Sequence, residues 1–137
     1  MPGYLLGQDR LEDAGIDEVI IYCVNDGAVM QAWGEVMQKK HAPSLLITFM
    51  GDPNCEVTKA LGLVIDHPGP VSKLGPNRCK RFAAYVVDGV VKALEVSEKE
   101  DDPAGDDFPE SSSIENMLKV IEAVAEESSS AKRRKSE

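Results

Sequence analysis

The chain has 137 residues, with 24 acidic against 15 basic side chains and a formal net charge of −9 at pH 7. This length suits one domain, and a 42% hydrophobic content is enough to form a core. The acidic balance argues against nucleic acid as a partner, because binding to phosphates needs clustered lysine and arginine. No apolar run approaches the roughly 18 residues of a membrane-spanning helix, so no membrane partner is expected.

The three cysteines, Cys23, Cys55 and Cys79, form no Cys-x-x-Cys pair. An odd number without paired spacing disfavours a disulfide scaffold or a zinc site and suits a reducing compartment. We therefore predict a cytoplasmic location. His41 and His67 are far apart with no ligand spacing around either, so we expect neither a metal nor another cofactor.

The first half of the sequence predicts a parallel strand–helix–strand unit. Residues 2–15 have helical spacing of apolar positions, and Gly15 suits the end of that helix. Residues 18–24 form an almost continuous apolar run, typical of a strand buried on both faces. Asp26 can cap the helix that follows, and residues 45–49 form a second buried strand. Such a βαβ unit places its two strands in parallel.

The second half predicts an antiparallel hairpin. A short helix over residues 55–61 is followed by a loop over residues 64–80, which is rich in proline and glycine. Residues 82–87 and 90–96 read as two strands joined by Asp88-Gly89. A two-residue Asp-Gly connection is among the strongest indications of a hairpin, because both residues must adopt positive φ.

The C-terminal part predicts an acidic loop, a helix and a tail. Residues 97–110 carry seven acidic side chains against one lysine and are expected to form a solvated loop. Ser112 and Glu115 have capping-box spacing, and apolar residues from Ile114 onward form one helical stripe. We therefore predict one α/β domain over residues 1–125. Residues 126–137 read as a disordered polar and basic tail.

That tail contains Lys132-Arg133-Arg134-Lys135, which is similar to a short nuclear-localisation patch. Four basic residues are a weak indication, and we do not assign a targeting role to them.

Seven stretches together suggest a family. They are Pro2-Gly3-Tyr4, Gly15-Ile16-Asp17-Glu18-Val19, Val24-Asn25-Asp26, Val29-Met30-Gln31-Ala32-Trp33, Thr58-Lys59-Ala60-Leu61-Gly62-Leu63, Lys80-Arg81-Phe82-Ala83 and Asp88-Gly89-Val90-Val91-Lys92-Ala93-Leu94. In this order and spacing, over residues 2–124, the chain resembles the type II or atypical two-cysteine peroxiredoxins. The resemblance implies a redoxin domain with a thioredoxin-like fold. It also implies reduction of hydrogen peroxide or organic hydroperoxides by a peroxidatic cysteine thiolate, with glutaredoxin, glutathione or thioredoxin as the thiol reductant.

The sequence departs from the family at the nucleophile. The family's peroxidatic cysteine lies upstream of the Pro-Gly-Tyr stretch, in a Pro-x-x-x-Thr-x-x-Cys loop that is not among these 137 residues. None of the three cysteines aligns with it. The active-site residue that the resemblance carries over is Arg81, which in the family favours the thiolate and the charge of the transition state. We therefore expect this chain by itself to be catalytically inert. Whether it is part of an active enzyme is left open by the sequence.

The missing part matters for folding as well. In the family sheet, the strand before the peroxidatic cysteine lies between the equivalents of residues 18–24 and 82–87. Without that strand we expect unpaired backbone edges and exposed apolar side chains between a βαβ half and a hairpin half. We expect either that the sequence is the back part of a longer protein, N-terminally truncated here, or that the two halves close up imperfectly.

Three alternatives remain at this stage. Cys55, at a predicted helix start, and Cys79, between Arg78 and Lys80, are candidate redox thiols, because both surroundings favour a thiolate. The basic cluster around Arg81 could bind an anion. A non-catalytic interaction or regulatory module that pairs with a full-length peroxiredoxin is the alternative to a peroxidase. A homodimer is the other pairing that the resemblance implies.

Overall fold

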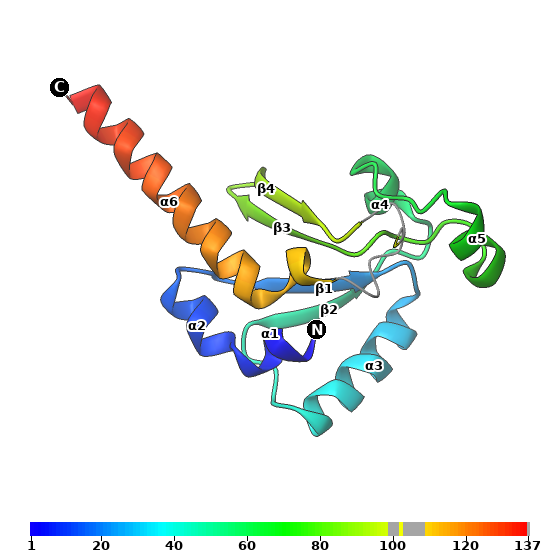
Figure 1. The fold of residues 1–137 in the computed structure, drawn as a ribbon. Helices are drawn as coiled ribbons and strands as arrows, with labels where there is room; N and C mark the ends of the chain where they lie inside the picture. Colours follow the sequence, from blue (N-terminus) through cyan, green and yellow to red (C-terminus); the bar gives the residue numbers. More distant parts are fainter. Residues whose placement is uncertain (99–101, 103–108, 137) are drawn as a thin grey trace.

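The computed structural model describes residues 1–98, 102 and 109–136. Its elements run in the order α1 (Pro2–Leu6), α2 (Gln8–Asp13), β1 (Val19–Cys23), α3 (Gly27–Lys40), β2 (Ile47–Gly51), α4 (Glu56–Ala60), α5 (Pro68–Leu74), β3 (Phe82–Val87), β4 (Val90–Val96), η1 (Glu110–Ser112) and α6 (Ile114–Ser136) (Figure 1). No described helix is both long enough and apolar enough to span a membrane. Most of the predicted acidic loop, residues 97–110, lies outside the described residues.

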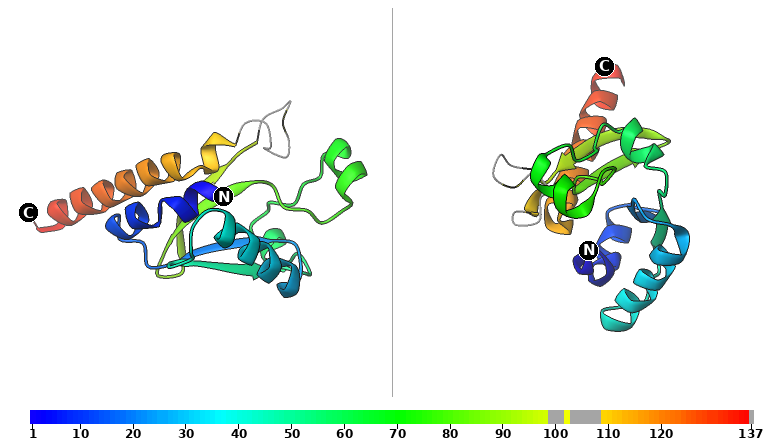
Figure 2. Two further views of the ribbon diagram at one scale, coloured as in Figure 1. Left: turned by 90° about the horizontal axis from the view of Figure 1, so that it is seen from below. Right: turned by 90° about the vertical axis from the view of Figure 1, so that its right-hand side faces the viewer.

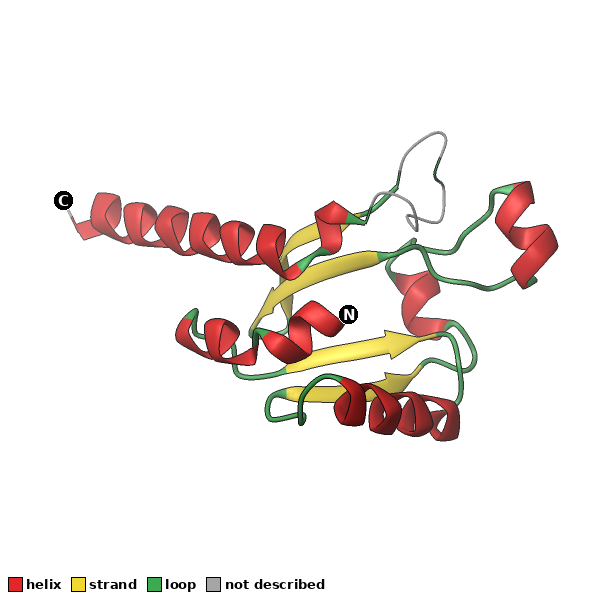
Figure 3. Cartoon of the chain, turned by 60° about the horizontal axis from the view of Figure 1, so that its bottom comes forward, coloured by secondary structure: helices red, strands yellow, loops and turns green. Residues whose placement is uncertain are grey.

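The strands form two separate sheets, as the sequence predicts. β1 pairs with β2 in parallel, from Val19 opposite Ile47 to Cys23 opposite Gly51. β3 pairs with β4 as an antiparallel hairpin with an irregularity at Tyr85. Within the described part of the chain, no strand pairing joins the two sheets. β1 runs toward the α5 end of the molecule and β3 runs away from it (Figures 1 and 3).

Local chemistry accounts for the elements that match the prediction. The Asp26 carboxylate accepts a hydrogen bond from the backbone N–H of Val29 at 2.8 Å and so caps α3. The hairpin turns on Asp88 and Gly89, with φ of 50° and 78°. The α6 helix buries Ile114, Met117 and Ile121 on one stripe, which packs against the hairpin.

Three predicted boundaries were wrong. The first helix is two short helices that break at Gly7, where φ is −107° and ψ is 20°. A glycine is needed at this break, because a side chain there would run into Ile114. The expected loop over residues 64–80 contains α5, whose first position is Pro68. The expected tail is helical as far as Ser136, since residues 126–135 are mostly good helix formers and carry basic side chains in the last turn. Figure 2 shows this part of α6 extending away from the body.

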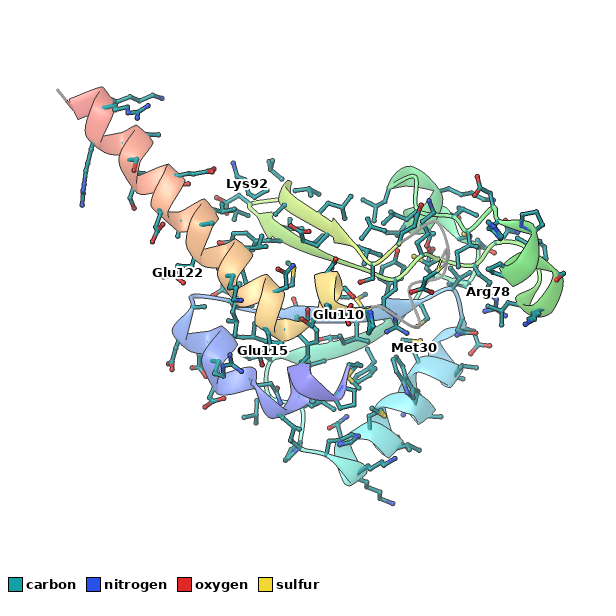
Figure 4. All side chains as sticks on the ribbon, in the orientation of Figure 1. Met30, Arg78, Lys92, Glu110, Glu115 and Glu122 are labelled. Carbon is teal, nitrogen blue, oxygen red and sulfur yellow. The ribbon has the colours of Figure 1, made fainter. Side chains whose placement is uncertain are left out.

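The α1–α2 pair connects the two halves of the molecule. On the hairpin side, the Tyr4 hydroxyl donates to the carbonyl of Ser112 at 2.6 Å. Arg10 forms a bidentate ion pair with Glu115: Nη1 donates to Oε1 at 3.0 Å and Nη2 to Oε2 at 2.8 Å. Glu115 lies where α6 meets α2 (Figure 4). These contacts place α1–α2 against the start of α6.

On the other side, the buried Gln8 side chain binds the loop that leads into β2. Its Nε2 donates to the carbonyls of Leu5 and Pro43, at 2.9 and 2.8 Å. Its Oε1 accepts from the backbone N–H groups of Leu45 and Leu46, at 2.7 and 2.9 Å. One side chain therefore satisfies two donors and two acceptors of the main chain.

Replacement of Gln8 by alanine should lower the free energy of unfolding by about 2 kcal/mol, because it leaves main-chain groups at the β2 entry without a partner. Urea unfolding followed by circular dichroism measures this change. The matched control is Gln31→Ala on the exposed face of α3, where the side chain donates to Glu35 at 3.3 Å, and we expect a change within about 0.5 kcal/mol. Equal losses in the two variants would contradict the connecting role of Gln8.

Candidate functional site

The site predicted from the sequence centres on Arg81, which lies directly before β3. Its side chain is exposed, and its carbonyl accepts the N–H of Ser97 at 2.9 Å, which continues the β3–β4 ladder. The guanidinium acts on two groups from other elements. Together with burial it lowers the pKa of the Met1 α-amino group, and it opposes the rise in the pKa of Cys23 at the end of β1. Arg81 thus faces the α1 and β1 side of the molecule.

The other two cations of the basic cluster have structural partners. Arg78 donates from Nη1 to the carbonyl of Val24 at 3.1 Å and from Nε to the carbonyl of Leu74 at 3.3 Å. It lies at the α5 end of the molecule (Figure 4). Lys80 pairs with Glu98 at 2.8 Å. Neither cation is therefore placed to act mainly on the neighbouring Cys79 thiol.

Cys79 is half-buried and belongs to a chain of hydrogen bonds. Its Sγ lies 3.5 Å from the Tyr22 hydroxyl and 3.0 Å from the carbonyl of Lys80. The Tyr22 hydroxyl lies 3.2 Å from Oγ1 of Thr58, which donates to the Asp52 carboxylate at 2.9 Å. Burial raises the pKa of Cys79, although the hydrogen bond between Cys79 and Tyr22 acts in the opposite direction. The flanking cations do not produce the thiolate that the sequence suggested.

Cys23 is in a similar position. Burial, and then the nearby Cys79, raise its pKa, while the guanidinium groups of Arg78 and Arg81 act to lower it. Desolvation outweighs the charges, so Cys23 is a neutral thiol at pH 7. Cys23 is a half-buried residue at the end of β1.

Cys55 precedes α4, as predicted, but it does not use the helix N-terminus. It is 1% exposed and has a left-handed φ of 59°. The first N–H groups of α4 donate instead to Asp52, from Val57 at 3.3 Å and Thr58 at 3.0 Å. The donors that could stabilise a Cys55 thiolate are therefore already paired with a carboxylate.

Sequence reasoning missed Tyr22 and Thr58, which the fold brings beside Cys79. Neither residue has neighbours in the sequence that indicate such a contact. Among the described residues, no three histidine, cysteine or carboxylate side chains are placed to hold a metal ion.

A parallel βαβ unit lies beside an antiparallel hairpin, with Arg81 at the hairpin's start, so the chain is a mixed α/β protein. The Redoxin family model matches residues 2–118. The chain therefore belongs to the redoxin family, and the relatives below place it with the type II peroxiredoxins.

Two relatives illustrate the similarity in sequence. Peroxiredoxin-2E-2, chloroplastic, of Oryza sativa subsp. japonica is 36% identical over 88% of this chain and 49% of its own length. Peroxiredoxin-2B of Arabidopsis thaliana is 33% identical over 88% of this chain and 66% of its own length. The chain thus spans about half the length of the first of these relatives. Relatives named for the chloroplast and for the mitochondrion occur together, so the cytoplasmic location stays a prediction.

Solved structures agree with this family. Reduced Prx3 of Vibrio vulnificus in complex with hydrogen peroxide is 32% identical, with a TM-score of 0.69 over 88% of this chain and 65% of that chain. Peroxiredoxin 5 of Alvinella pompejana is 26% identical, with a TM-score of 0.65 over 89% of this chain and 67% of that chain. The predicted thioredoxin-like fold of the peroxiredoxin type is confirmed.

The raised pKa of Cys79 predicts slow alkylation at neutral pH, because only the thiolate reacts. In the variant Cys23→Ser, Cys55→Ala, the rate with iodoacetamide should rise with pH and reach half its maximum above the ordinary value of 9.0. Mass spectrometry of the modified protein gives the rate. A midpoint below about 8 would mean that the cations favour the thiolate after all.

Proposed function

We propose that this chain forms the arginine-bearing part of a thiol peroxidase that reduces hydrogen peroxide and organic hydroperoxides. The supporting observation is the family match over residues 2–118, which includes Arg81 in its exposed place before β3. The nucleophile in this proposal is a cysteine from outside these 137 residues. Peroxide and a thiol reductant are the partners that the family implies for the whole protein.

In the proposed reaction, a cysteine thiolate attacks one oxygen of the peroxide. The S–O bond forms, the O–O bond breaks, and the second oxygen leaves with a proton as water or an alcohol. The sulfur becomes a sulfenic acid and has lost two electrons. Two thiols of glutaredoxin, glutathione or thioredoxin type restore the cysteine: they supply two electrons by forming a disulfide, and the oxygen leaves as water. The Arg81 guanidinium would stabilise the attacking thiolate and the negative charge on the leaving oxygen.

The three cysteines of the chain are poor substitutes for that nucleophile. Cys55 is buried, and burial raises the pKa of both Cys23 and Cys79. A neutral or inaccessible thiol cannot carry out the first step at a useful rate. The chain alone is therefore not a peroxidase in this proposal.

This predicts that the 137-residue chain consumes hydrogen peroxide, with dithiothreitol as reductant, no faster than its triple variant Cys23→Ser, Cys55→Ser, Cys79→Ser. A colorimetric peroxide assay over time measures the rates. Turnover that persists in Arg81→Ala but disappears in Cys55→Ser or Cys79→Ser would place the chemistry on one of this chain's own thiols and refute the proposal.

A gain of function tests the role of Arg81. A chimaera that joins the cysteine-bearing N-terminal part of a type II peroxiredoxin to this chain should reduce peroxide. In it, Arg81→Ala should lower kcat/KM by about 10²–10³-fold, as loss of a transition-state donor does. Lys92→Ala, on the exposed hairpin, is the control and should leave the rate unchanged. An active chimaera that tolerates Arg81→Ala would remove Arg81 from the mechanism.

A further inference from the structure

The far half of α6 takes no part in the packing of the fold. Ile121 is the last residue of this helix that is buried, and Val124 is half-buried, whereas residues 125–135 are all exposed. Figure 2 shows this part of the helix extending away from the body. It also lies beyond residues 2–118, which the Redoxin family model matches. Neither the core nor the family match therefore accounts for these residues.

The end of this helix concentrates positive charge. The four consecutive residues from Lys132 to Lys135 are basic, and residues 128–137 contain a single acidic side chain, Glu137. The other 127 residues hold 11 basic and 23 acidic side chains. We call residues 128–136 the basic tip. The negative charge of the chain thus belongs to the body, and the basic tip has the opposite sign.

The basic tip lies far enough from the body to act as a separate charge. At 1.5 Å per residue, Lys132 and Lys135 lie about 12 and about 17 Å beyond Val124 along the helix axis. The Debye length is about 8 Å at physiological ionic strength, so salt screens most of the field of the acidic body at the tip. The net charge of the whole chain disfavours nucleic acid as a partner, but it does not describe a patch at this distance.

The cations of the basic tip are not neutralised along the helix. Ion pairs on a helix join residues three or four positions apart, and no acidic residue lies three or four positions before any of the four cations. In the part of the chain that the structure describes, Lys132, Arg134 and Lys135 form no ion pair, and all three are exposed. These side chains are therefore available to an external anion.

The arrangement of the cations favours an anion that surrounds the helix. Successive residues of an α-helix are about 100° apart, so four consecutive cations point to nearly all sides of it. Figure 4 shows side chains with nitrogen at their ends leaving the end of α6 in more than one direction. A flat anionic surface reaches only some of them. Ala131 is the one apolar residue of the basic tip, so the tip also lacks the apolar face that a helix inserts into a membrane.

We propose that the basic tip of α6 is a binding site for the phosphate backbone of duplex DNA, with the helix end in the major groove. A helix with its side chains is about 10–12 Å wide, and the major groove is about 12 Å wide with phosphates along both walls. Cations on opposite sides of the helix then reach opposite walls. The exposed hydroxyl groups of Ser128 to Ser130 are further donors to phosphate.

The length of the exposed helix suits this placement. The groove is about 8.5 Å deep, whereas the basic tip begins beyond the last half-buried residue, Val124, and ends about 18 Å from it. The acidic body therefore stays outside the groove. The contacts are to phosphates, so binding is independent of the base sequence. This inference does not rest on the proposed peroxidase activity.

The probe is a fluorescein-labelled DNA duplex of about 20 base pairs, titrated with the full chain and followed by fluorescence anisotropy. Three to four phosphate contacts predict a slope of about −3 for log K against log salt, so Kd should rise roughly 60-fold between about 50 and about 200 mM NaCl. No binding at the lower salt with about 100 μM chain, or a Kd that does not change with salt, would refute the proposal.

The triple variant Lys132→Gln, Arg134→Gln, Lys135→Gln removes three of the four cations and keeps good helix formers. It should weaken binding at least about tenfold at the lower salt and reduce the slope to about −1. Circular dichroism verifies that α6 is retained.

The matched control is Lys39→Gln, Lys40→Gln, Lys92→Gln, which removes three exposed cations from the body. It should change Kd by less than about threefold, because these residues do not enter the groove. If the two triple variants weaken binding equally, the affinity follows total charge and the assignment to the basic tip is wrong.

Two comparisons test the helical geometry. Ala131→Pro keeps every charge but interrupts α6 before the four cations, and it should weaken binding at least about fivefold. An RNA duplex of the same sequence has a major groove too narrow for a helix and should also bind at least about fivefold more weakly. Equal binding in either comparison would mean a flexible polycation and would overturn the groove proposal. Tighter binding to phosphatidylserine vesicles at equal negative charge would overturn it in favour of a membrane surface.

Discussion

Side chains, rather than a shared backbone ladder, hold the two sheets of this protein together. Among the described residues, β1–β2 and β3–β4 have no strand pairing between them. At one end Gln8 binds the entry to β2, while Tyr4 and Arg10 bind the start of α6. At the other end Tyr22 meets Phe82 and Cys79. The relative position of the halves therefore depends on few contacts, some of them exposed to solvent.

The same separation explains why apolar strands are only partly buried. A run such as VIIYC normally belongs to a strand covered on both faces and paired on both edges. Here none of its five residues is fully buried, and Ile20 is 53% exposed. The residues of β1 are typical of an interior strand, although β1 lies at an edge of its sheet.

At the candidate site, desolvation competes with charge. Arg78 and Arg81 lie near Cys23 and favour its thiolate, yet burial prevails and raises the pKa. Around Cys79, the neighbouring cations are bound to Val24 and Glu98 instead. The sequence prediction therefore overestimated the effect of these cations on the pKa of Cys79. The fold, and not adjacency in the sequence, determines which groups a long basic side chain contacts.

The sequence alone predicted the order of the four strands, the hairpin at Asp88-Gly89, the redoxin family and the division into two halves. The strands and the hairpin follow from local periodicity and turn chemistry, which are properties of neighbouring residues. The family and the division into two halves follow from the resemblance that the ordered motifs carry. It did not predict the break at Gly7, the role of Gln8 or the contact of Tyr22 with Cys79. Gly7 is required by Ile114, Gln8 binds residues 43–46, and Tyr22 meets a residue far along the chain. Only folding brings such distant residues together, so only the tertiary structure could decide them.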